Sequence, residues 1–489
     1  MMKIAIIGGG PAGLAMAKSL AMEPEVEKFI SSIDMYERRD KLGGLWYYTG
    51  DKEHVLPPVP STTYNNFEEI YDGGDSEKHD YDDINKRLVS PMYRHLETNI
   101  VKQMMAYKDV PFPEECERFP TREEVWEYMI TYSKTIPKIG ELVNIKLSHN
   151  VESVKKLDNK KWELISKNLA EHGSLETDNY DYVIFAQGHF EIPFIPQVDG
   201  LKEWNEKAPL GSVTHAKYYN DCDKYKDKTV LIVGNSASGI DITTQLSTVA
   251  KKVIVSSNNV SAFGKIDIHD DKVIEITRIK KYDYDNDRTI YGDEGEIESN
   301  IDYIIFCTGY LYSLPFLKNY VDPKQESDNI ISNDGTYLKN LYKHMFYIHD
   351  PTLIHICAPK NVIPMAFSEA QAAYASRVIT DRIKLPTTEG MLKDYENQIK
   401  LKDGKPQDVL IMKFPEDALL AKEYNDIVND CKDGKGGFIA DYWTEEKIQL
   451  RKDTVPLKSD RLKLIVKHAN KLSKDKTPFY LLRGDTSNL

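Results

Sequence analysis

The sequence predicts an α/β fold built from two parallel-sheet domains, with the second domain inserted into the first. Two glycine-rich turns carry this prediction, GGGPAG beginning at Gly8 and GNSASG beginning at Gly234. Each follows a short apolar run and is answered later by a similar octapeptide, DYVIFAQG at 181–188 or DYIIFCTG at 302–309. A strand, a glycine turn and a helix, repeated with a matching later strand, are typical of two Rossmann-like dinucleotide-binding domains.

The composition limits the classes of protein that this chain can represent. Its 489 residues are enough for two or three domains, and hydrophobic and charged fractions of 41% and 29% are ordinary for a globular protein. The net charge of −13 argues against a nucleic-acid partner, because binding phosphates needs a strongly basic surface. No apolar run reaches the roughly 18 residues of a membrane span, and 462–489 is rich in lysine, so we expect no membrane partner.

The N-terminus and the cysteines indicate a compartment. The first strand begins at Lys3, which leaves no room for a secretory signal. The five cysteines contain no C-x-x-C pair, which favours free thiols in a reducing compartment. They are Cys116, Cys222, Cys307, Cys357 and Cys431. We therefore expect a cytoplasmic protein, with peripheral association with the endoplasmic reticulum as an open alternative.

The first domain is expected to open with a strand, a helix and a strand. β-Branched residues occupy 4–7, apolar residues recur at helical spacing in 14–22, and a strand at 32–36 ends on Glu37. The further expected elements are a mobile acidic insertion at 67–84, an amphipathic helix at 122–132, and strands at 151–157 and 161–166. The DYVIFAQG strand then closes this part of the chain.

The second domain is expected to follow a proline-containing hinge at 192–196, because proline holds the preceding residue extended. Its strand–helix–strand unit begins at Thr229, and its partner strand lies at 253–256. The segments KVIEITRI, RTIY and GEIES predict a small antiparallel meander. A crossover near 311–315 and a helix at 368–382 follow. The expected limits are 1–197 for the first part of the first domain, 198–311 for the second domain, and 312–489 for the rest of the first domain and the C-terminal region.

The first glycine loop has the spacing of a dinucleotide-binding turn. Its glycines permit a tight turn, close approach of a diphosphate to the backbone, and close packing of helix on strand. The diphosphate would lie at the helix N-terminus, where free amides and the helix dipole favour an anion. Glu37 stands at the end of the next strand, where an acidic residue binds ribose hydroxyls. A turn that serves backbone geometry alone would not need Glu37 in this register.

Another glycine segment, 43–46, distinguishes the first site from the second. In flavoproteins with two dinucleotide sites, such a segment wraps the flavin diphosphate, so we expect FAD at the first loop. In the second loop Ser236 replaces the middle glycine, and the next strand ends on four uncharged polar residues, Ser256, Ser257, Asn258 and Asn259. The missing acidic residue leaves room for a 2′-phosphate and favours NADPH over NADH.

The positive charge that a 2′-phosphate needs is not evident directly after this strand, because no arginine follows it. Lys217, Lys251 and Lys252 are candidates for that charge. An ordinary solvated surface lysine is the alternative for each of them.

Over almost its whole length the chain resembles the flavin-containing monooxygenase family, and most closely its yeast and fungal members. The resemblance is carried by GGGPAG, GGLW, YRHLETN, QGHFEIPFIP, GSVTHAKYY, GNSASG, FCTGYLYSLPF and IPMAFSEAQAA. Family members carry a linker fingerprint, F-x-G-x-x-x-H-x-x-x-(F/Y/W), before the second loop. Gly211, His215 and Tyr219 occupy its later positions, whereas Pro209 stands where the family has phenylalanine.

This resemblance implies a mechanism in which the flavin performs the chemistry and the protein positions and shelters it. NADPH would reduce FAD, dioxygen would add to give a C4a-hydroperoxyflavin, and a soft nucleophile would take up the distal oxygen. The implied substrates are small thiols, such as glutathione, cysteine or cysteamine, or amines. The family places the asparagine of L-x-T-N, here Asn99, beside the flavin, where an amide hydrogen-bonds without offering an acidic proton. The alternative to this functional role is a structural one, in which the side chain of a loop asparagine hydrogen-bonds to its own backbone. No metal is implied.

Motifs and resemblance together assign a set of residues to the two cofactors. His215 is given a positional role without acid–base chemistry, and Gln371 is expected to contact the flavin from the first turn of a helix. Cys307 is expected to be core packing. The full set is Gly8, Gly10, Pro11, Ala12, Gly13, Glu37, Arg38, Gly44, Leu45, Trp46, Asn99, Val151, Gln187, Gly188, His189, His215, Tyr219, Gly234, Asn235, Ser236, Ala237, Ser238, Gly239, Thr308, Gly309, Tyr310 and Gln371.

Three other functions use related frameworks. Baeyer–Villiger monooxygenases extend the fingerprint with a tryptophan, where this chain has Tyr219. Disulfide reductases need a redox-active C-x-x-C pair, which the sequence lacks. A non-catalytic binding protein would not need both glycine loops and Glu37 intact. For the oligomeric state, a homodimer is the default expectation.

Overall fold

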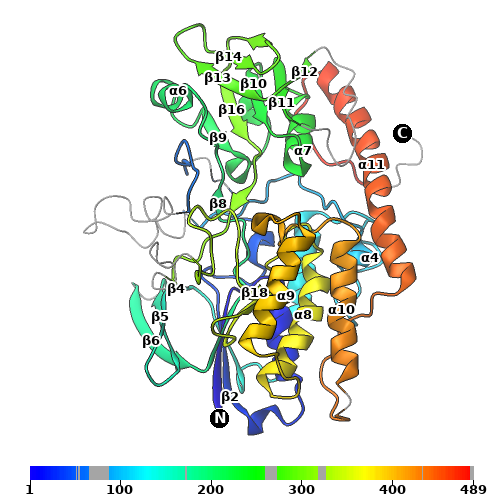
Figure 1. The fold of residues 1–489 in the computed structure, drawn as a ribbon. Helices are drawn as coiled ribbons and strands as arrows, with labels where there is room; N and C mark the ends of the chain where they lie inside the picture. The colour runs from blue at the N-terminus through cyan, green and yellow to red at the C-terminus, as the bar shows by residue number, and fades with distance from the viewer. Residues whose placement is uncertain are drawn as a thin grey trace.

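The computed structural model describes residues 1–50, 52, 55–64, 88–170, 173–258, 272–317, 327–431 and 433–484. The chain forms two α/β units joined by a pair of connections, with a long helix along one side of both (Figure 1). We call the unit built on a seven-stranded sheet the first domain and the unit built on a five-stranded sheet the second domain. The insertion expected at 67–84 lies outside the described residues.

The first domain is built on a mainly parallel sheet. In spatial order its strands are β18 (Leu341–Tyr342), β19 (Phe346–Tyr347), β20 (Leu353–His355), β7 (Tyr182–Phe185), β1 (Met2–Ile7), β2 (Ile30–Tyr36) and β3 (Val143–Lys146). The five strands from β20 to β3 pair in parallel, and β18 and β19 pair antiparallel at one edge. Helix α1 (Pro11–Ala21) is almost wholly buried against this sheet and helix α8 (Pro364–Ile379). The predicted strand–helix–strand unit is confirmed, although its helix begins at Pro11 rather than at 14.

The second domain is built on a fully parallel sheet. Its strands, in spatial order, are β12 (Val273–Ile276), β11 (Lys252–Ser256), β10 (Thr229–Val233), β16 (Tyr303–Phe306) and β9 (Val213–His215). Helix α7 (Ala237–Leu246) follows β10, and Cys307 is buried in the core beneath it, as expected. All strands of this sheet come from a single stretch of chain that interrupts the first domain, so the insertion predicted from the sequence is confirmed.

The predicted meander needs one correction. An antiparallel three-stranded sheet is present, formed by β13 (Ile279–Asp283), β14 (Thr289–Gly292) and β15 (Ile297–Glu298). Its expected first segment is divided, because Val273–Ile276 pairs in parallel with β11 and extends the main sheet. A short alternating segment fits either pairing, and only the chain path decides between them.

Two short strands connect the domains. β8 (Ile192–Pro193) lies on the way into the second domain, and β17 (Tyr310–Leu311) lies on the way out. They pair antiparallel, with Leu311 beside Ile192, so both connections run side by side at one place (Figure 1). The predicted hinge at 192–196 is thus half of a two-stranded link.

The remaining elements surround the first sheet. An antiparallel sheet contains β4 (His149–Lys156), β5 (Trp162–Asn168) and β6 (Ser174–Tyr180). The other helices are α4 (Lys102–Met105), α5 (Arg122–Ser133), α6 (Leu201–Lys207), α9 (Thr388–Leu401), α10 (Glu416–Asp430) and α11 (Glu445–Lys474), and short 3₁₀ helices occupy Val26–Lys28, Gly44–Trp46, Ala216–Tyr218, Asp223–Tyr225 and Pro406–Asp408. The helix expected at 122–132 is confirmed, with a capping box between Thr121 and Glu124. The helix expected at 368–382 instead spans Pro364–Ile379, because proline suits its first turn.

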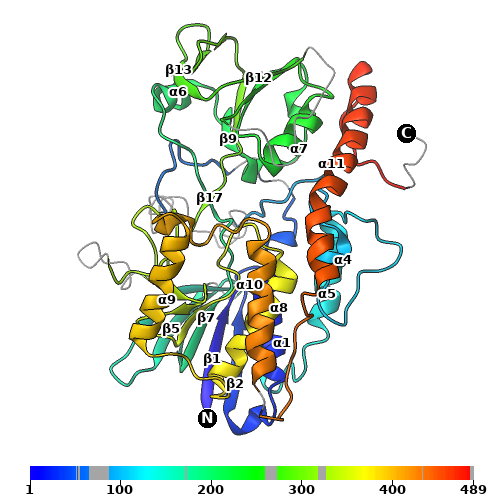
Figure 2. The same cartoon turned by 45° about the vertical axis from the view of Figure 1, so that its right-hand side comes forward.

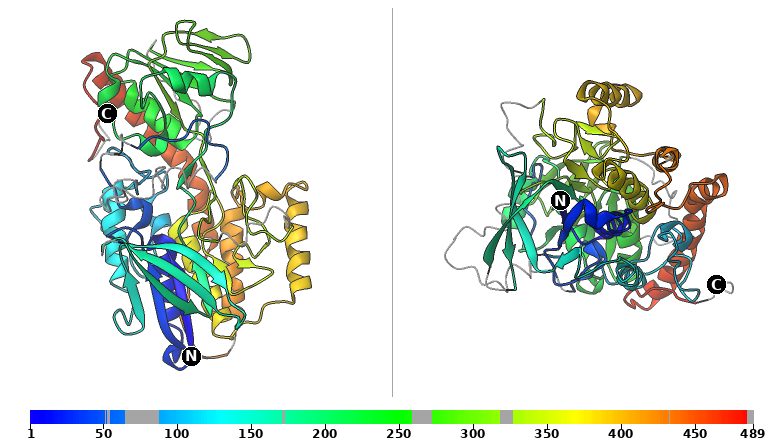
Figure 3. Two further views of the ribbon diagram at one scale, coloured as in Figure 1. Left: turned by 90° about the vertical axis from the view of Figure 1, so that its left-hand side faces the viewer. Right: turned by 90° about the horizontal axis from the view of Figure 1, so that it is seen from below.

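Helix α11 belongs to both domains. In Figure 2 it runs past α4 and α5 and continues beside α7, and the views from the side and from below in Figure 3 place it outside both sheets. Arg451 near its start pairs with Asp417 of α10 at 2.7 Å, whereas Ile465 and Leu472 join the core of the second domain. Despite its length it is polar, and no helix within the described ranges has the apolar stretch that crossing a bilayer requires.

Candidate functional site

The first glycine loop joins β1 to α1 with very little space to spare. Gly8 has a φ of +112°, a conformation that favours glycine, and a β-carbon on Gly13 would overlap the carbonyl oxygen of Gly8. A β-carbon on Gly10 would lie 3.3 Å from Cα of Gly44. Gly10 ends the turn and none of the described side chains caps α1, so its first amides face the carboxyl edge of the sheet. This cradle fits a diphosphate.

Glu37 is held in place directly after β2. Its Oε2 accepts a hydrogen bond from the Gly9 N–H at 2.8 Å, and its Oε1 accepts one from the Arg39 N–H at 2.9 Å. The side chain is only 5% exposed, so the carboxylate is positioned before any ligand arrives. Its place beside the glycine loop is the one that a ribose-binding acid needs.

The segment containing Gly44, Leu45 and Trp46 covers this loop, as the sequence predicts. The Gly43 N–H donates to the Gly9 carbonyl at 3.0 Å, and Arg39 donates through Nη1 to the Gly44 carbonyl at 2.7 Å. The arginine therefore ties the covering segment to the end of β2.

Two buried polar atoms lie near the end of β7, beside β1. Oε1 of Gln187 and Nδ1 of His189 make no hydrogen bond to any described residue. Buried polar atoms in folded proteins are nearly always paired, so these two fit a site that a bound molecule completes. Burial and nearby Lys360 lower the pKa of His189 to about 3, so its ring is neutral at pH 7.

The second glycine loop repeats the tight turn of the first. Gly234 has a φ of +104°, and a β-carbon on Gly239 would overlap the Gly234 carbonyl oxygen. Ser236 stands at the N-terminus of α7, where it is exposed and makes no capping hydrogen bond to a described residue. Its hydroxyl is therefore available at the end of the helix where an anion is favoured. The other loop members, Asn235, Ala237 and Ser238, line the same turn.

The next strand of the second domain ends without an acid, and its neighbour brings an arginine there. Ser256 of β11 lies beside Ile276 of β12, and the Ser257 N–H still donates to the Ile276 carbonyl at 3.2 Å. Arg278 therefore follows at the same edge of the sheet. Its side chain is 66% exposed and pairs with Asp293 at 3.0 Å. The sequence does not reveal this arginine, because it reaches the site through a separate strand.

Two of the lysines considered for a 2′-phosphate are already engaged. Lys252 pairs with Glu298 at 2.6 Å. Lys217 is only 2% exposed and donates to the Glu191 carboxylate at 2.6 Å and to the Glu191 carbonyl at 2.7 Å. Arg38, directly after β2, also pairs with Glu191. Lys217 is therefore part of a buried ion network that joins the two domains and is not a solvated surface lysine, whereas Lys252 is a partly exposed lysine in an ion pair.

The fingerprint residues pack inside the protein. His215 is fully buried, its Nδ1 accepts from the Lys217 N–H at 3.1 Å, and burial together with the charge of Lys217 lowers its pKa to about 3. Its ring meets that of Tyr310 edge to face at 5.0 Å. Tyr219 is also fully buried and donates to Gln245 of α7 at 3.0 Å. Tyr219 therefore supports the dinucleotide helix from behind.

Three more assigned residues belong to the connection that leads out of the second domain through β17. Thr308 hydrogen-bonds through its hydroxyl to the Phe194 carbonyl, and the Gly309 carbonyl accepts from the Phe194 N–H at 2.9 Å. Tyr310 begins β17. These residues lie beyond the carboxyl end of β16, next to the second glycine loop, and they join it to the link between domains.

Asn99 lies in an irregular segment that touches both domains. It is half-buried, and its amide makes no hydrogen bond to another described residue. Earlier in the segment, Tyr93 donates to Asp241 of α7, and the Arg94 N–H donates to the Asn220 carbonyl at 3.0 Å. The side chain is therefore held at the junction of the domains with its amide available.

One assigned residue, Gln371, is placed differently from expectation. Gln371 is not in the first turn of α8 but in its middle, fully buried, where its Oε1 accepts from the Cys357 N–H at 2.8 Å. It therefore fixes the turn after β20 from within the core. Val151 is buried in β4, at a register irregularity in its pairing with β5. Gly188, by contrast, lies at the carboxyl edge with a φ of +73°.

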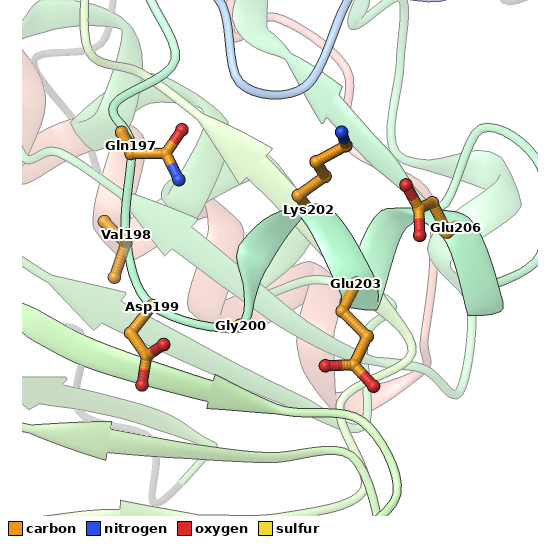
Figure 4. Close-up of a pocket in the computed structure, with 7 residues that line it drawn as sticks. All are labelled: Gln197, Val198, Asp199, Gly200, Lys202, Glu203 and Glu206. Atoms are coloured by element: carbon orange, nitrogen blue, oxygen red, sulfur yellow. The ribbon is translucent and has the colours of Figure 1, made fainter.

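A surface hollow elsewhere is separate from this junction. It has a volume of about 380 Å³ and lies between the turn at Gln197 and helix α6, with Glu203 and Glu206 on its wall (Figure 4). It contains no residue of either glycine loop. The residues that carry nucleotide-binding geometry meet instead at the carboxyl edges of the two parallel sheets, where ligands bind in such folds.

Known proteins share this arrangement. A family model described as flavin-binding monooxygenase-like matches residues 65–267 and 268–413, and a model of an NAD(P)-binding Rossmann-like domain matches 6–72. The chain is 32% identical over 491 residues to a thiol-specific monooxygenase of Saccharomyces cerevisiae, covering 98% of this chain and 97% of that one.

Two solved structures show the same fold. The S-allyl-L-cysteine S-oxygenase from Allium sativum superposes with a TM-score of 0.72 at 24% identity, covering 97% of this chain and 99% of that one. Tmm from Pelagibacter sp. superposes with a TM-score of 0.66 at 22% identity, covering 97% and 91%. From the match to the family model and the similarity to the yeast protein along nearly the whole sequence, we conclude that this chain belongs to the flavin-binding monooxygenase-like family and is a flavin-containing monooxygenase that uses a flavin and NAD(P)H.

Proposed function

We propose that this enzyme uses FAD, NADPH and dioxygen to oxygenate small thiols. The observation that carries the substrate class is the 32% identity, over 98% of the chain, to a yeast protein named for thiol-specific monooxygenation. Glutathione, cysteine and cysteamine are the leading candidates, because each presents a compact sulfur nucleophile. Amines are the second substrate class to test, since nitrogen is the other soft nucleophile of this chemistry.

The first glycine loop fits FAD. The cradle of Gly8, Gly10 and Gly13 would hold the diphosphate, and Glu37 would bind the ribose hydroxyls. With the ribose at the end of β2 and the diphosphate at β1, the rest of the dinucleotide would extend along the carboxyl edge toward β7, where Gln187 and His189 have unpaired atoms. Bound FAD would accept a hydride from NADPH and activate dioxygen.

The chain's own residues would shelter this chemistry from protons. His189 and His215, both buried and both with a pKa lowered to about 3, stay neutral and offer no acidic proton at pH 7. Asn99 would hydrogen-bond to the cofactor through a neutral amide. This set of groups binds and orients while leaving proton transfer to the substrate thiol.

The second domain would bind NADPH rather than NADH. The absence of an acid after β11 and the presence of Arg278 at the end of the neighbouring strand support this choice. The exposed ion pair of Arg278 with Asp293 is weak, so the guanidinium can turn to a phosphate at little cost. Gly234, Ser236 and Gly239 would hold the diphosphate at α7.

The domain limits and the compartment belong to the same proposal. We assign 1–197 and 312–489 to the FAD domain with its C-terminal region, and 198–311 to the NADPH domain, which agrees with the strand order of the two sheets. Each of the five cysteines is a free thiol, as suits a reducing compartment, and we propose the cytoplasm.

Anaerobic reduction followed by oxygen tests the function. Purified enzyme is reduced with NADPH without oxygen and then mixed with oxygenated buffer, with and without glutathione, while flavin absorbance is followed. We expect reoxidation to depend on dioxygen, and thiol to be consumed in proportion to NADPH. Trimethylamine and a cyclic ketone serve as alternative substrates. Conversion of the ketone to a lactone without thiol oxidation would favour a Baeyer–Villiger enzyme, and reduction of disulfides without oxygen would contradict the proposal.

A further inference from the structure

The segment that ends at Asn99 is fixed by two helices. One is α7, the dinucleotide helix of the second domain. Tyr93 donates to the carboxylate of Asp241 in this helix, and Gln245 one turn later donates to the His95 carbonyl at 3.4 Å. The other is α11, which approaches the segment at Glu97 and Thr98.

The contact with α11 is a buried ion-pair cluster. Glu97 is 6% exposed and Lys458 is 2% exposed. Lys458 donates to the Glu97 carboxylate at 2.8 Å and to the Thr98 carbonyl at 2.9 Å, and Arg461 donates to the other Glu97 oxygen at 2.8 Å. These cations hold the pKa of Glu97 below its usual value even though burial opposes ionisation. Both residues that precede Asn99 are therefore bound by one lysine.

The cluster contributes placement more than net stability. Breaking a buried ion pair by removing one partner is costly, whereas replacing both partners with neutral side chains of similar size is often nearly neutral. A cluster that adds little to folding but binds two successive residues fixes where the next residue lies. The Thr98 hydroxyl donates to the Ile100 carbonyl at 2.8 Å, which closes a turn around Asn99.

We propose that Glu97 and Lys458 are positioning residues for Asn99, and that α11 sets the placement of its amide relative to both domains. This inference rests on the proposed function of Asn99 beside the flavin. Helix α11 suits the task because its later turns pack into the core of the second domain through Ile465 and Leu472. The same helix thus contacts the NADPH domain and holds the asparagine that serves FAD.

Four variants separate the placement of Asn99 from the stability of the fold. Glu97→Gln leaves Lys458 buried without its carboxylate, so we expect a lower Tm. Glu97→Gln with Lys458→Met removes the carboxylate and the buried lysine, while Arg461 keeps its hydrogen bond to the Leu482 carbonyl at 2.7 Å. We therefore expect the Tm to recover in part, while the bond to the Thr98 carbonyl stays lost. Lys463→Met, which removes an exposed pair with Asp460 at 2.7 Å on the same helix, is the matched control. Asn99→Ala marks the effect of losing the amide itself.

Two readouts are compared across these variants. The first is hydrogen peroxide released per NADPH oxidised with glutathione present, together with kcat for thiol oxidation. The second is amide hydrogen exchange over 93–100 in enzyme without substrate. In the double variant we expect more peroxide, faster exchange and a kcat lower by about tenfold, since small misplacements of a functional group are costly. Lys463→Met should match the wild type in all three measurements.

The possible outcomes separate the positioning role of Glu97 and Lys458 from the proposed function of Asn99. A double variant with wild-type exchange and wild-type peroxide release overturns the positioning role, provided that Asn99→Ala releases peroxide. If Asn99→Ala itself remains fully coupled, the proposed function of Asn99 fails, and the inference fails with it. If the double variant does not fold, Glu97→Asp gives the same test, because it retains the charge and shifts the carboxylate.

Discussion

The two dinucleotide domains share a strand–turn–helix–strand unit and differ at the residue that follows its second strand. In the first domain Ile7 of β1 lies beside Tyr36 of β2, and in the second Val233 of β10 lies beside Ser256 of β11. The residue after the second strand is Glu37 in one case and Ser257 in the other. An acid favours free ribose hydroxyls, and a small neutral side chain admits a phosphate. Under the proposed function, this one position would let two similar strand–turn–helix–strand units receive different nucleotides.

The glycine loops of the two domains also differ, in how far other residues cover them. In the first domain the loop is covered, since Gly44 approaches Gly10 and is tied down by Arg39. In the second domain the corresponding middle position is Ser236, which is exposed. A covered loop suits a cofactor that stays bound, and an open loop suits one that must leave after each turnover. Under the proposed function, the difference would let one chain hold a flavin and exchange a nicotinamide nucleotide.

Closing either loop should produce the largest effects. A valine at Gly13 or at Gly239 would force its side chain into the carbonyl of the preceding strand end, at Gly8 or at Gly234. We expect Gly13→Val to lose FAD affinity by about a thousandfold, equivalent to roughly 4 kcal/mol. Gly239→Val should lose NADPH affinity to a similar degree and keep its flavin. Flavin content and NADP⁺ titration check both, and a colourless Gly239→Val protein would contradict the separation of the two sites.

Exchanging the ribose residues should have the next largest effect. Glu37→Ser removes a charged acceptor from the FAD ribose, and we expect FAD affinity to fall by about tenfold to a hundredfold. Ser257→Glu places a negative charge against a 2′-phosphate, so the preference for NADPH over NADH should fall by about a hundredfold. Isothermal titration with each nucleotide gives both values. An unchanged NADPH preference in Ser257→Glu would mean that the two strand ends are not equivalent.

A smaller effect is expected from the arginine that only the second domain brings to this edge. Arg278→Gln should weaken binding of adenosine 2′,5′-bisphosphate by about tenfold and leave binding of 5′-AMP unchanged. Arg288→Gln is the matched control, because Arg288 pairs with Asp302 at 3.1 Å at the opposite end of the same sheet. Equal weakening by both variants would point to general charge rather than to phosphate recognition.

A further expected effect concerns the dependence of stability on pH, because each domain has a buried acid with a raised pKa next to its dinucleotide helix. Burial raises the pKa of Glu369 in α8, which packs on α1, to about 7, and that of Asp241 in α7 to about 6. The protonated form of each acid is therefore favoured in the folded state. The free energy of unfolding is highest below the pKa that the acid has in the unfolded chain, and it falls as the pH rises through the pKa of the folded state. The expected slope is at most about 1.4 kcal/mol per pH unit for each group.

Urea unfolding at several pH values tests this difference. Glu369→Gln should flatten the loss of stability between about pH 5 and 7, and Asp241→Asn should flatten it between about pH 4 and 6. Identical profiles for both variants and the wild type would show that the two acids do not titrate in these ranges.

Local sequence patterns were sufficient to predict those parts of the candidate site whose residues lie close together in the chain. The glycine turns, the flanking apolar strands and Glu37 lie close together in the chain, so spacing alone indicates their roles. Arg278 could not be predicted in this way, because it follows β12. The four residues of β12 do not reveal whether the strand pairs in parallel or antiparallel. The role of Lys458 could not be predicted from the sequence either, because its partner Glu97 lies in a distant part of the chain and only the packing of α11 brings the two together.

Burial explains the assignments that changed. Lys217 reads as a candidate phosphate ligand from its position alone, and the structure shows it neutralised by Glu191. Gln371 carries a side chain typical of cofactor contacts, yet it lies fully buried in the middle of α8 and accepts a hydrogen bond from Cys357. Whether a polar side chain faces a ligand or the interior depends on the tertiary packing around it, which residue type and spacing do not determine.

The pairing of β8 with β17 has a consequence for engineering. Because the second domain leaves and re-enters the first through two adjacent, hydrogen-bonded strands, its two ends meet at one point. Such a domain can be exchanged as a cassette, with a homologue's nucleotide preference carried over in one piece. A graft must also match the late turns of α11, packed through Ile465 and Leu472, the ion pair of Lys217 with Glu191, and the hydrogen bond of Tyr93 to Asp241. A chimaera that keeps those contacts should accept a foreign nicotinamide domain while retaining its own flavin.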